Sequence, residues 1–291
     1  MIKTLFLAAA ALSAVCLDLA TTQATSAATL NRAWVSGHGN DVAGCSAPTN
    51  PCRSLQYVVT DVIAPGGEID ILDPAGYGAV TIPFALSIVN DGVGTAGVQA
   101  TSGAAITINA GLTDTVTLRG LDIDGLGSGA YGVLMNSGGV LTVVNCVIRH
   151  FTSTGVNIAP GSGTTTVSIS NTIASDNGYA GIGFDPSGTG IVNGVISQTT
   201  VANNAHYGVS IFNYGGGSAS ATIVDSLASN NVFGFGAENA AASLLLGHSV
   251  ATGNSQAGVY LTASATGQTY GDNKLSGNGA PSSLLSSVAM Q

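Results

Sequence analysis

Short apolar segments recur at a long, nearly constant spacing between residues 131 and 278. Each segment opens with a glycine that an apolar residue follows. The pairs are Gly132-Val133, Gly155-Val156, Gly181-Ile182, Gly208-Val209, Gly234-Phe235 and Gly258-Val259. Successive glycines lie 23, 26, 27, 26 and 24 residues apart. A period of this length predicts a solenoid, in which stacked repeats bury a core that no single repeat could form.

A second apolar segment, with a polar residue at its centre, lies between these glycines. The central polar residues are Asn145, Asn171, Gln198, Asp225 and His248. Their aliphatic neighbours favour strands, and parallel strands of consecutive coils lie about 4.8 Å apart. We therefore expect a structural ladder, whose side chains bond to one another and to turn groups that would otherwise be buried and unpaired.

Four segments are predicted along the chain. Residues 1–27 are typical of a secretory signal peptide, because Lys3 precedes an apolar stretch that ends in small residues. Residues 28–67 form a predicted cap, residues 68–279 a solenoid whose first coils are less regular, and residues 280–291 a tail. We expect a secreted, periplasmic or cell-surface protein, and no later stretch reaches the ~18 apolar residues of a membrane span.

The cap is expected to contain a short strand, a cysteine-bearing loop and a helix. Leu55, Val58, Val59 and Val62 share one face of the predicted helix, and Pro65-Gly66-Gly67 should end it. The first coil of a solenoid exposes an apolar cross-section and unpaired strand edges. A helix at this place would cover both.

Three cysteines remain after removal of the signal peptide. Export favours a disulfide between Cys45 and Cys52, which would hold the loop of the cap together. Cys146 is expected to be a buried thiol without reactivity. Cys16 is a poor lipoprotein site, since Val15 stands where a small residue is required.

The composition narrows the class of function. Charged residues make up only 7% of the chain, and the 45% hydrophobic content excludes a disordered protein. A net charge of −9 argues against nucleic acid as a partner, and anionic polysaccharides would need a metal ion to bind. Neutral glycans remain suitable. No cofactor is predicted, and calcium at Asn40-Asp41 stays open, because acidic turn residues alone are weak evidence.

Several segments resemble one superfamily. Gly39-Asn40-Asp41, the Pro-Cys-Arg-Ser-Leu-Gln of residues 51–56, Pro65-Gly66-Gly67-Glu68-Ile69 and the asparagine-containing coils are similar to secreted right-handed parallel β-helix proteins of the pectin-lyase-like superfamily. The resemblance covers roughly residues 32–278. It implies an all-β, right-handed parallel β-helix with a short N-terminal capping helix. It does not imply one activity, because the superfamily includes lyases, hydrolases, epimerases, adhesins and phage tailspikes.

One candidate for chemistry is a file of turn residues. Alignment of the coils places Asp124, His150 and Asp176 at one turn position, followed by Asn203 and Asn230. Two carboxylates about 10 Å apart around an imidazole could act as acid and base on a glycosidic bond. Arg149 could bind a sugar carboxylate. The alternative is a row of ordinary solvated turn residues.

Aromatic residues offer a second candidate. Tyr131, Tyr207 and Phe233 each precede a coil-starting glycine, and Tyr179 lies one place earlier in its coil. They could form a stripe that stacks on successive sugar rings, or they could pack between coils. Three functions follow from the sequence: a non-catalytic binder of extracellular polysaccharide, which we favour, a polysaccharide lyase or glycoside hydrolase, and a structural or adhesive module.

Overall fold

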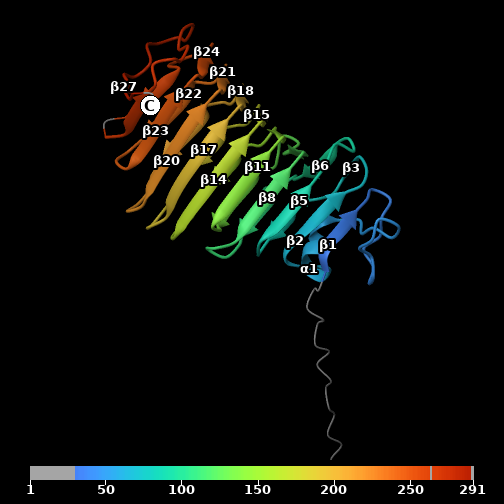
Figure 1. Ribbon diagram of the computed structural model, residues 1–291. Coiled ribbons are helices and arrows are strands. Elements are labelled where there is room, and N and C mark those ends of the chain that lie inside the picture. The colour runs from blue at the N-terminus through green and yellow to red at the C-terminus, as the bar shows by residue number, and fades with distance from the viewer. Residues whose placement is uncertain (1–29, 263, 290–291) are drawn as a thin grey trace, which may run out of the picture.

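The protein is described by a computed structural model that covers residues 30–262 and 264–289. The predicted signal peptide, residues 1–27, lies outside the described residues. The chain winds as a parallel β-helix in which each full coil contributes one strand to each of three sheets (Figure 1). Each strand inside a sheet pairs in parallel with strands of the coils before and after it, and the strands at the sheet ends pair on one side. The predicted all-β solenoid is therefore confirmed.

The three sheets run along the whole solenoid and are called sheets 1, 2 and 3. Sheet 1 consists of β1 (Leu30–Val35), β2 (Ile63–Ile71), β5 (Leu86–Val89), β8 (Thr115–Arg119), β11 (Val140–Val144), β14 (Thr164–Ser170), β17 (Ile191–Ser197), β20 (Ser218–Val224), β23 (Ala242–Gly247), β26 (Thr266–Thr269) and β27 (Ser286–Ser287). Sheet 2 consists of β3 (Ala75–Gly76), β6 (Ala96–Gln99), β9 (Leu121–Asp124), β12 (Val147–Arg149), β15 (Ile173–Ser175), β18 (Thr200–Ala202), β21 (Leu227–Ser229) and β24 (Val250–Thr252). Sheet 3 consists of β4 (Val80–Ile82), β7 (Ala104–Asn109), β10 (Tyr131–Ser137), β13 (Thr154–Ile158), β16 (Ala180–Phe184), β19 (Tyr207–Phe212), β22 (Phe233–Glu238) and β25 (Val259–Leu261).

The core is a continuous column of aliphatic side chains between the three sheets. In one coil, Val143 of sheet 1, Ile148 of sheet 2 and Val156 of sheet 3 are all fully buried. Alternate residues of each strand point inward, and the next coil repeats the same type at the same place. Stacked coils thus bury the apolar face that a single coil would leave exposed.

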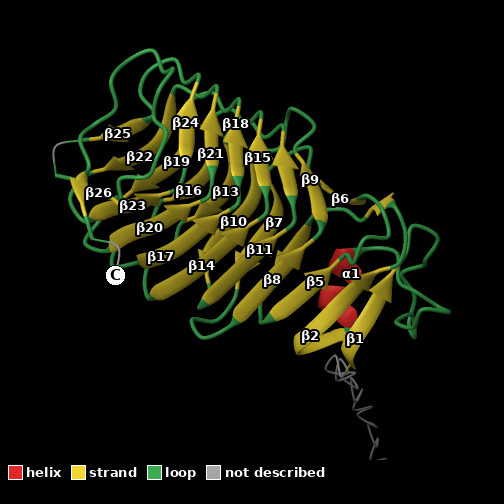
Figure 2. Ribbon diagram, turned by 45° about the horizontal axis from the view of Figure 1, so that its top comes forward, coloured by secondary structure: helices red, strands yellow, loops and turns green. Residues whose placement is uncertain are grey.

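The N-terminal end is covered by α1 (Leu55–Asp61), which lies against the first coils (Figure 2). Ser54 caps the helix by accepting a hydrogen bond from the Tyr57 amide at 3.3 Å. Gln56 Oε1 accepts from the Thr81 amide at 2.8 Å, which satisfies a donor on the first strand of sheet 3. The helix stops earlier than predicted, and Pro65-Gly66-Gly67 lies inside β2. A boundary at residue 67 therefore divides a strand of sheet 1.

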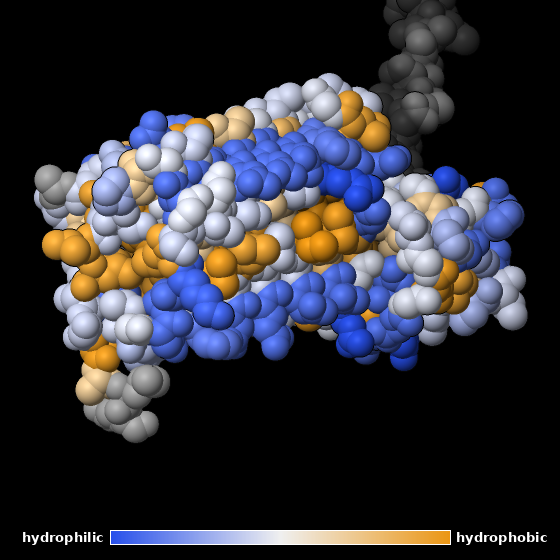
Figure 3. Space-filling model, turned by 90° about the horizontal axis from the view of Figure 1, so that it is seen from above, coloured by the Kyte–Doolittle hydropathy of each residue, from blue (hydrophilic) through white to orange (hydrophobic). Residues whose placement is uncertain are grey.

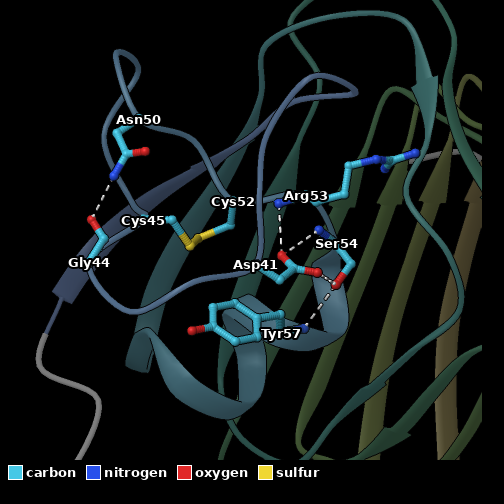
Figure 4. The surroundings of a disulfide bond; sticks show 8 residues. All are labelled: Asp41, Gly44, Cys45, Asn50, Cys52, Arg53, Ser54 and Tyr57. Carbon is cyan, nitrogen blue, oxygen red and sulfur yellow. Dashed lines mark hydrogen bonds between the residues drawn. A yellow bond between two sulfur atoms is a disulfide. The ribbon is translucent and has the colours of Figure 1, made fainter.

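The loop before α1 contains the disulfide between Cys45 and Cys52, whose Cα atoms are 5.0 Å apart (Figure 4). The Asp41 carboxylate accepts from the Arg53 amide at 2.8 Å and the Ser54 amide at 3.0 Å. It also accepts from the Ser54 hydroxyl at 2.7 Å. Asp41 thus joins the loop to the start of the helix.

The C-terminal end is covered by the tail. β27 pairs with β26, and the Ser282 and Ser283 hydroxyls accept from the amides of Val259 and Leu261 at 3.1 and 3.0 Å. These bonds satisfy the last strand of sheet 3 without a helix. Among the described residues, no helix is long and apolar enough to cross a membrane.

The predicted ladder lines up in space, but its members are exposed. All five adopt left-handed backbone angles, with φ between 45° and 57°, at the turn from sheet 1 to sheet 2. Side-chain bonds join only two pairs of them, Asn171 to Asn145 at 3.1 Å and His248 to Asp225 at 2.5 Å. The expectation that this column satisfies buried turn groups is therefore wrong.

A different asparagine ladder satisfies buried turn groups, and it lies at the turn from sheet 2 to sheet 3. Its members are Asn177, Asn204, Asn231, Asn254 and Asn278. Each amide donates to the carbonyl oxygen of the next at 2.8–3.1 Å, and that oxygen also accepts from the backbone amide of the coil before. Each member follows the residue with positive φ at its turn, which turns its side chain inward.

Candidate functional site

The predicted catalytic file lies at the turn from sheet 2 to sheet 3. His150 and Asp176 occupy equivalent turn positions, with φ of 61° and 57°. Asp124 does not share that position, because it is the last residue of β9 and pairs with Arg149. The alignment from the sequence was wrong by one residue at this coil, where Gly125 stands level with His150.

Asp124 is nevertheless in contact with His150, as part of an ion-pair network. The His150 imidazole Nδ1 lies 3.1 and 3.2 Å from the two Asp124 oxygens. Arg149 reaches Asp124 at 3.2 Å and Asp122 at 3.3 Å. Partial burial alone would raise the pKa of Asp124, but bonds from the Leu126 amide, Arg149 and His150 lower it below its usual range. Asp124 is thus a fully engaged carboxylate.

A shallow hollow of about 580 Å³ lies beside this network, with His150 and Asp176 in its wall. The predicted role of Arg149 in binding a sugar carboxylate fits poorly, since its guanidinium already pairs with two carboxylates. The side chains of this network are paired with one another. The network therefore leaves neither a free carboxyl group for acid catalysis nor a free cation to bind a sugar.

The outer face of sheet 2 offers little chemistry. Seen from above in Figure 3, an apolar band runs along the solenoid between two hydrophilic bands. The first residues of five neighbouring strands stand side by side along this face, and they are Val147, Ile173, Thr200, Leu227 and Val250. We place no catalytic group on it.

The outer face of sheet 3 carries a cluster of aromatic rings. Tyr179 stacks on His206 at 5.4 Å between ring centroids, Tyr207 stacks on Phe233 at 5.3 Å, and Phe233 stacks on Tyr260 at 4.1 Å. His206 connects Tyr179 to the stack of Tyr207, Phe233 and Tyr260, since its ring centroid lies 4.4 Å from that of Tyr207. The cluster therefore crosses four consecutive coils.

The predicted aromatic stripe is thus present in part. Tyr179, Tyr207 and Phe233 belong to the cluster, whereas Tyr131 makes none of its ring contacts. Tyr207 is only 3% exposed and cannot offer a stacking surface. Its ring lies over Gly236, where a Cβ atom would come within 2.7 Å of it. Tyr179, at 38% exposed, keeps an accessible face.

A row of polar and glycine residues lies next to these rings. Asn157, Gly183, Ser210 and Gly236 pair in register across four strands, and each points away from the core. Asn157 is 8% exposed, and its Oδ1 atom has no hydrogen-bond partner. Ser210 is 2% exposed. Polar groups without partners at such depth are characteristic of a ligand site.

Two carboxyl groups stand at the end of this row. Asp185 follows the last residue of β16 and stands level with Phe212, which pairs with Glu238. Two strand spacings therefore separate Asp185 from Glu238, or about 10 Å between Cα atoms. Burial without a compensating cation raises the pKa of Asp185 to about 7. Glu238 accepts a hydrogen bond from the Tyr207 hydroxyl.

Tyr179 and Tyr214 lie near enough to Asp185 for its charge to affect their hydroxyl groups. Burial, and then the negative charges of Asp185 and other neighbours, raise the pKa of Tyr179 to about 12. The pKa of Tyr214, which is 67% exposed, is raised by the same causes. These phenols therefore stay protonated at neutral pH and can donate hydrogen bonds.

The sequence reasoning missed Asn157, Asp185, Ser210 and Glu238. Two signals could have indicated them. Gly183 and Gly236 interrupt outward positions of otherwise apolar strands, and such glycines often mark close approach of another group. The carboxyl groups lie at the ends of strands of the same sheet, where the coil period places them in line.

Cys146 is a buried thiol, as expected, and burial raises its pKa to about 11. Within residues 30–262 and 264–289, no group of three or more histidine, cysteine and acidic side chains is arranged to hold a metal ion.

Comparison with known proteins gives a family for this fold. A model described as "right handed beta helix region" matches residues 104–279. No curated protein sequence matches. The solved pectate lyase Pel9A is similar in structure, with a TM-score of 0.61 and 17% identity over 91% of this chain and 78% of that chain. A GH136 lacto-N-biosidase from Eubacterium ramulus, solved as a selenomethionine derivative, has a TM-score of 0.39 and 10% identity over 90% and 67%. The first likeness shows the fold alone, and the second is too low to support an inference.

Proposed function

The chain belongs to the right-handed β-helix family, and we propose that it binds extracellular polysaccharide along the outer face of sheet 3. The observation that carries this proposal is the aromatic cluster beside buried polar groups that lack protein partners. Aromatic faces stack on sugar rings, and nearby amide and hydroxyl groups recognise sugar hydroxyls. A polymer along the solenoid axis would pass aromatic rings from four consecutive coils.

Two further observations support this proposal. The Cys45–Cys52 disulfide is typical of proteins in oxidising compartments outside the cytoplasm, where polysaccharides of cell surfaces occur. The similar pectate lyase, to judge by its name, acts on a polysaccharide. That likeness supports only the suitability of the scaffold, because one fold serves many functions.

The test is retention of the mature protein in native gels that contain plant or bacterial polysaccharides. We expect retention by at least one polymer, and Tyr179→Ala should weaken it at least tenfold because the accessible ring face is lost. Tyr270→Ala is the matched control, since Tyr270 lies over Gly247 of sheet 1. Absence of retention on a broad panel would contradict the proposal and favour a structural or adhesive module.

Hydrolysis of the bound polymer is a second candidate, which the pair of carboxyl groups favours. Inverting glycosidases hold two carboxyl groups roughly 6.5–9.5 Å apart, which leaves room for a water molecule. Asp185 and Glu238 stand two strand spacings apart, about 10 Å between Cα atoms, and both point outward from the same sheet. Asp185, with its pKa near 7, would donate a proton to the glycosidic oxygen. Glu238 would take a proton from the water that attacks the anomeric carbon.

Release of reducing ends separates this candidate from binding alone. A hydrolase should release them with the wild-type protein, and both Asp185→Asn and Glu238→Gln should abolish release while retention persists. A wild-type protein that retains polymer without releasing sugar excludes hydrolysis and leaves the binding proposal intact.

A further inference from the structure

The polar groups that pack around Gly183 indicate which sugars the proposed site accepts. Building on the proposed polysaccharide site, we infer that Asn157, Asp185 and Ser210 form a subsite for the hydroxyl groups of a neutral sugar. We infer further that the surrounding face rejects chains of uronic acids.

The first step is the unpaired amide of Asn157. This side chain lies on β13, is 8% exposed, and its buried oxygen has no partner in the protein. A buried amide oxygen without a hydrogen bond costs about 1–3 kcal/mol, so a protein rarely retains one without use. The missing partner must be a donor, and a sugar hydroxyl is a donor.

The second step is the close packing over Gly183. A Cβ atom on this glycine would lie 2.9 Å from Asp185 Oδ2 and 3.0 Å from Asn157 Oδ1. Both oxygens therefore pack closely over the backbone of Gly183, an approach that is possible only because residue 183 has no side chain. At the equivalent position one coil further on, Ser210 adds a hydroxyl, and at Gly236 the ring of Tyr207 lies over the backbone.

The third step is the sign of the charges. Asp185 and Glu238 stand on this face, and the cationic side chains of the described residues lie elsewhere. Arg32 pairs with Glu68 and Asp70, Arg119 with Asp91, and Arg149 with Asp122 and Asp124, while Arg53 bonds to Gly76 and Lys274 lies next to β24. Of the described residues, no arginine or lysine stands on the face to pair with the carboxylate of a uronic acid. His206 of the aromatic cluster is the one basic side chain that these residues place there, and the two carboxylates would repel the acid.

The experiment compares polymers that differ only at the charged group. The probes are polygalacturonate and its carboxyl-reduced form, xylan with and without glucuronic acid side groups, and cellulose with its C6-oxidised form. Affinities are measured at pH 8 and low salt, where the Asp185 carboxyl is ionised. At least one neutral member should bind, and its charged counterpart should bind at least tenfold more weakly.

Three variants test the residues. Asn157→Ala should lower affinity for the neutral polymer at least tenfold, and Gly183→Ala should do the same, because its methyl group would displace the Asp185 and Asn157 oxygens. Asn193→Ala is the matched control, because Asn193 lies on β17 of sheet 1, away from this face, and should leave affinity unchanged. Glu238→Gln should reduce the preference for the neutral over the charged polymer, a change that a purely structural residue would not cause.

The outcomes separate the inference from the proposal on which it rests. Equal or tighter binding of the charged polymers overturns the inference while polysaccharide binding survives. Asn157→Ala with unchanged affinity and an unchanged melting temperature also overturns the inference. Binding of no polymer overturns both.

Discussion

Two groups of carboxylates on neighbouring parts of this solenoid are held in opposite ways. At the turn from sheet 2 to sheet 3, Asp124 bonds to Arg149 and His150, and its pKa is lowered. On the outer face of sheet 3, burial raises the pKa of Asp185 to about 7 without a cation to offset it. A paired carboxylate stabilises the folded chain, whereas an unpaired buried one destabilises it. A group that costs stability is the better candidate for function.

The largest expected effect is a gain of stability in Asp185→Asn. The pKa of Asp185 rises from an ordinary value of 3.8 to about 7 on folding, so the folded chain binds the proton more tightly. The contribution of this carboxyl group to the free energy of unfolding is fully present below about pH 4 and is lost as the pH rises to about 7. Because the side chain is partly exposed, we expect the variant to gain about 2 kcal/mol at pH 8.

Urea unfolding at pH 5 and pH 8 measures this difference. The gap between Asp185→Asn and the wild type should widen toward pH 8. A variant that is less stable than the wild type at pH 8 would show that Asp185 stabilises the fold, and the contrast with Asp124 would disappear.

A smaller effect of opposite sign is expected for Asp124→Asn. Its loss of ionic bonds to Arg149 and His150 should lower the free energy of unfolding by about 1 kcal/mol at pH 7. The pKa of Asp124 is lowered on folding, so the contribution is present above the unfolded pKa and is lost as the pH falls through the folded pKa. Asp176→Asn, at an exposed turn position, should stay within about 0.5 kcal/mol of the wild type in the same unfolding assay.

An effect slightly smaller than that of Asp124→Asn is expected for Tyr207→Phe. This variant keeps the ring over Gly236 and removes the hydroxyl that donates to Glu238. A loss of about 0.5–1 kcal/mol by thermal or urea unfolding is expected, since one hydrogen bond to a charged, partly exposed group is removed. A loss of several kcal/mol would mean that Glu238 is a structural residue and not a free group of the site.

The period of the sequence was sufficient to predict the fold, because core packing requires the same inward residue type in every coil. It was insufficient to predict the ladder. Each turn from sheet 2 to sheet 3 offers two adjacent polar residues, as in Asp176-Asn177 and Asn203-Asn204. Only the backbone angle decides which of the two points inward, and the left-handed first residue turns the second toward the core.

The candidate site could be predicted only in part. Tyr179 was found because aromatic residues recur beside the coil glycines. Asp185 and Asn157 were missed, because their importance depends on burial and on the absence of a partner, which one strand pattern does not reveal. Asp124 was ranked too highly as a catalytic candidate, since the sequence alignment of coils did not show that Arg149 stands level with it.

The central claim is that polysaccharide binds at the outer face of sheet 3 and not at the turn from sheet 2 to sheet 3. Retention in polysaccharide gels should be measured side by side for the wild type, Tyr179→Ala and His150→Ala. The account predicts at least a tenfold loss for Tyr179→Ala and wild-type retention for His150→Ala. Loss for His150→Ala with normal retention for Tyr179→Ala would contradict it and move the site to the hollow beside Asp176.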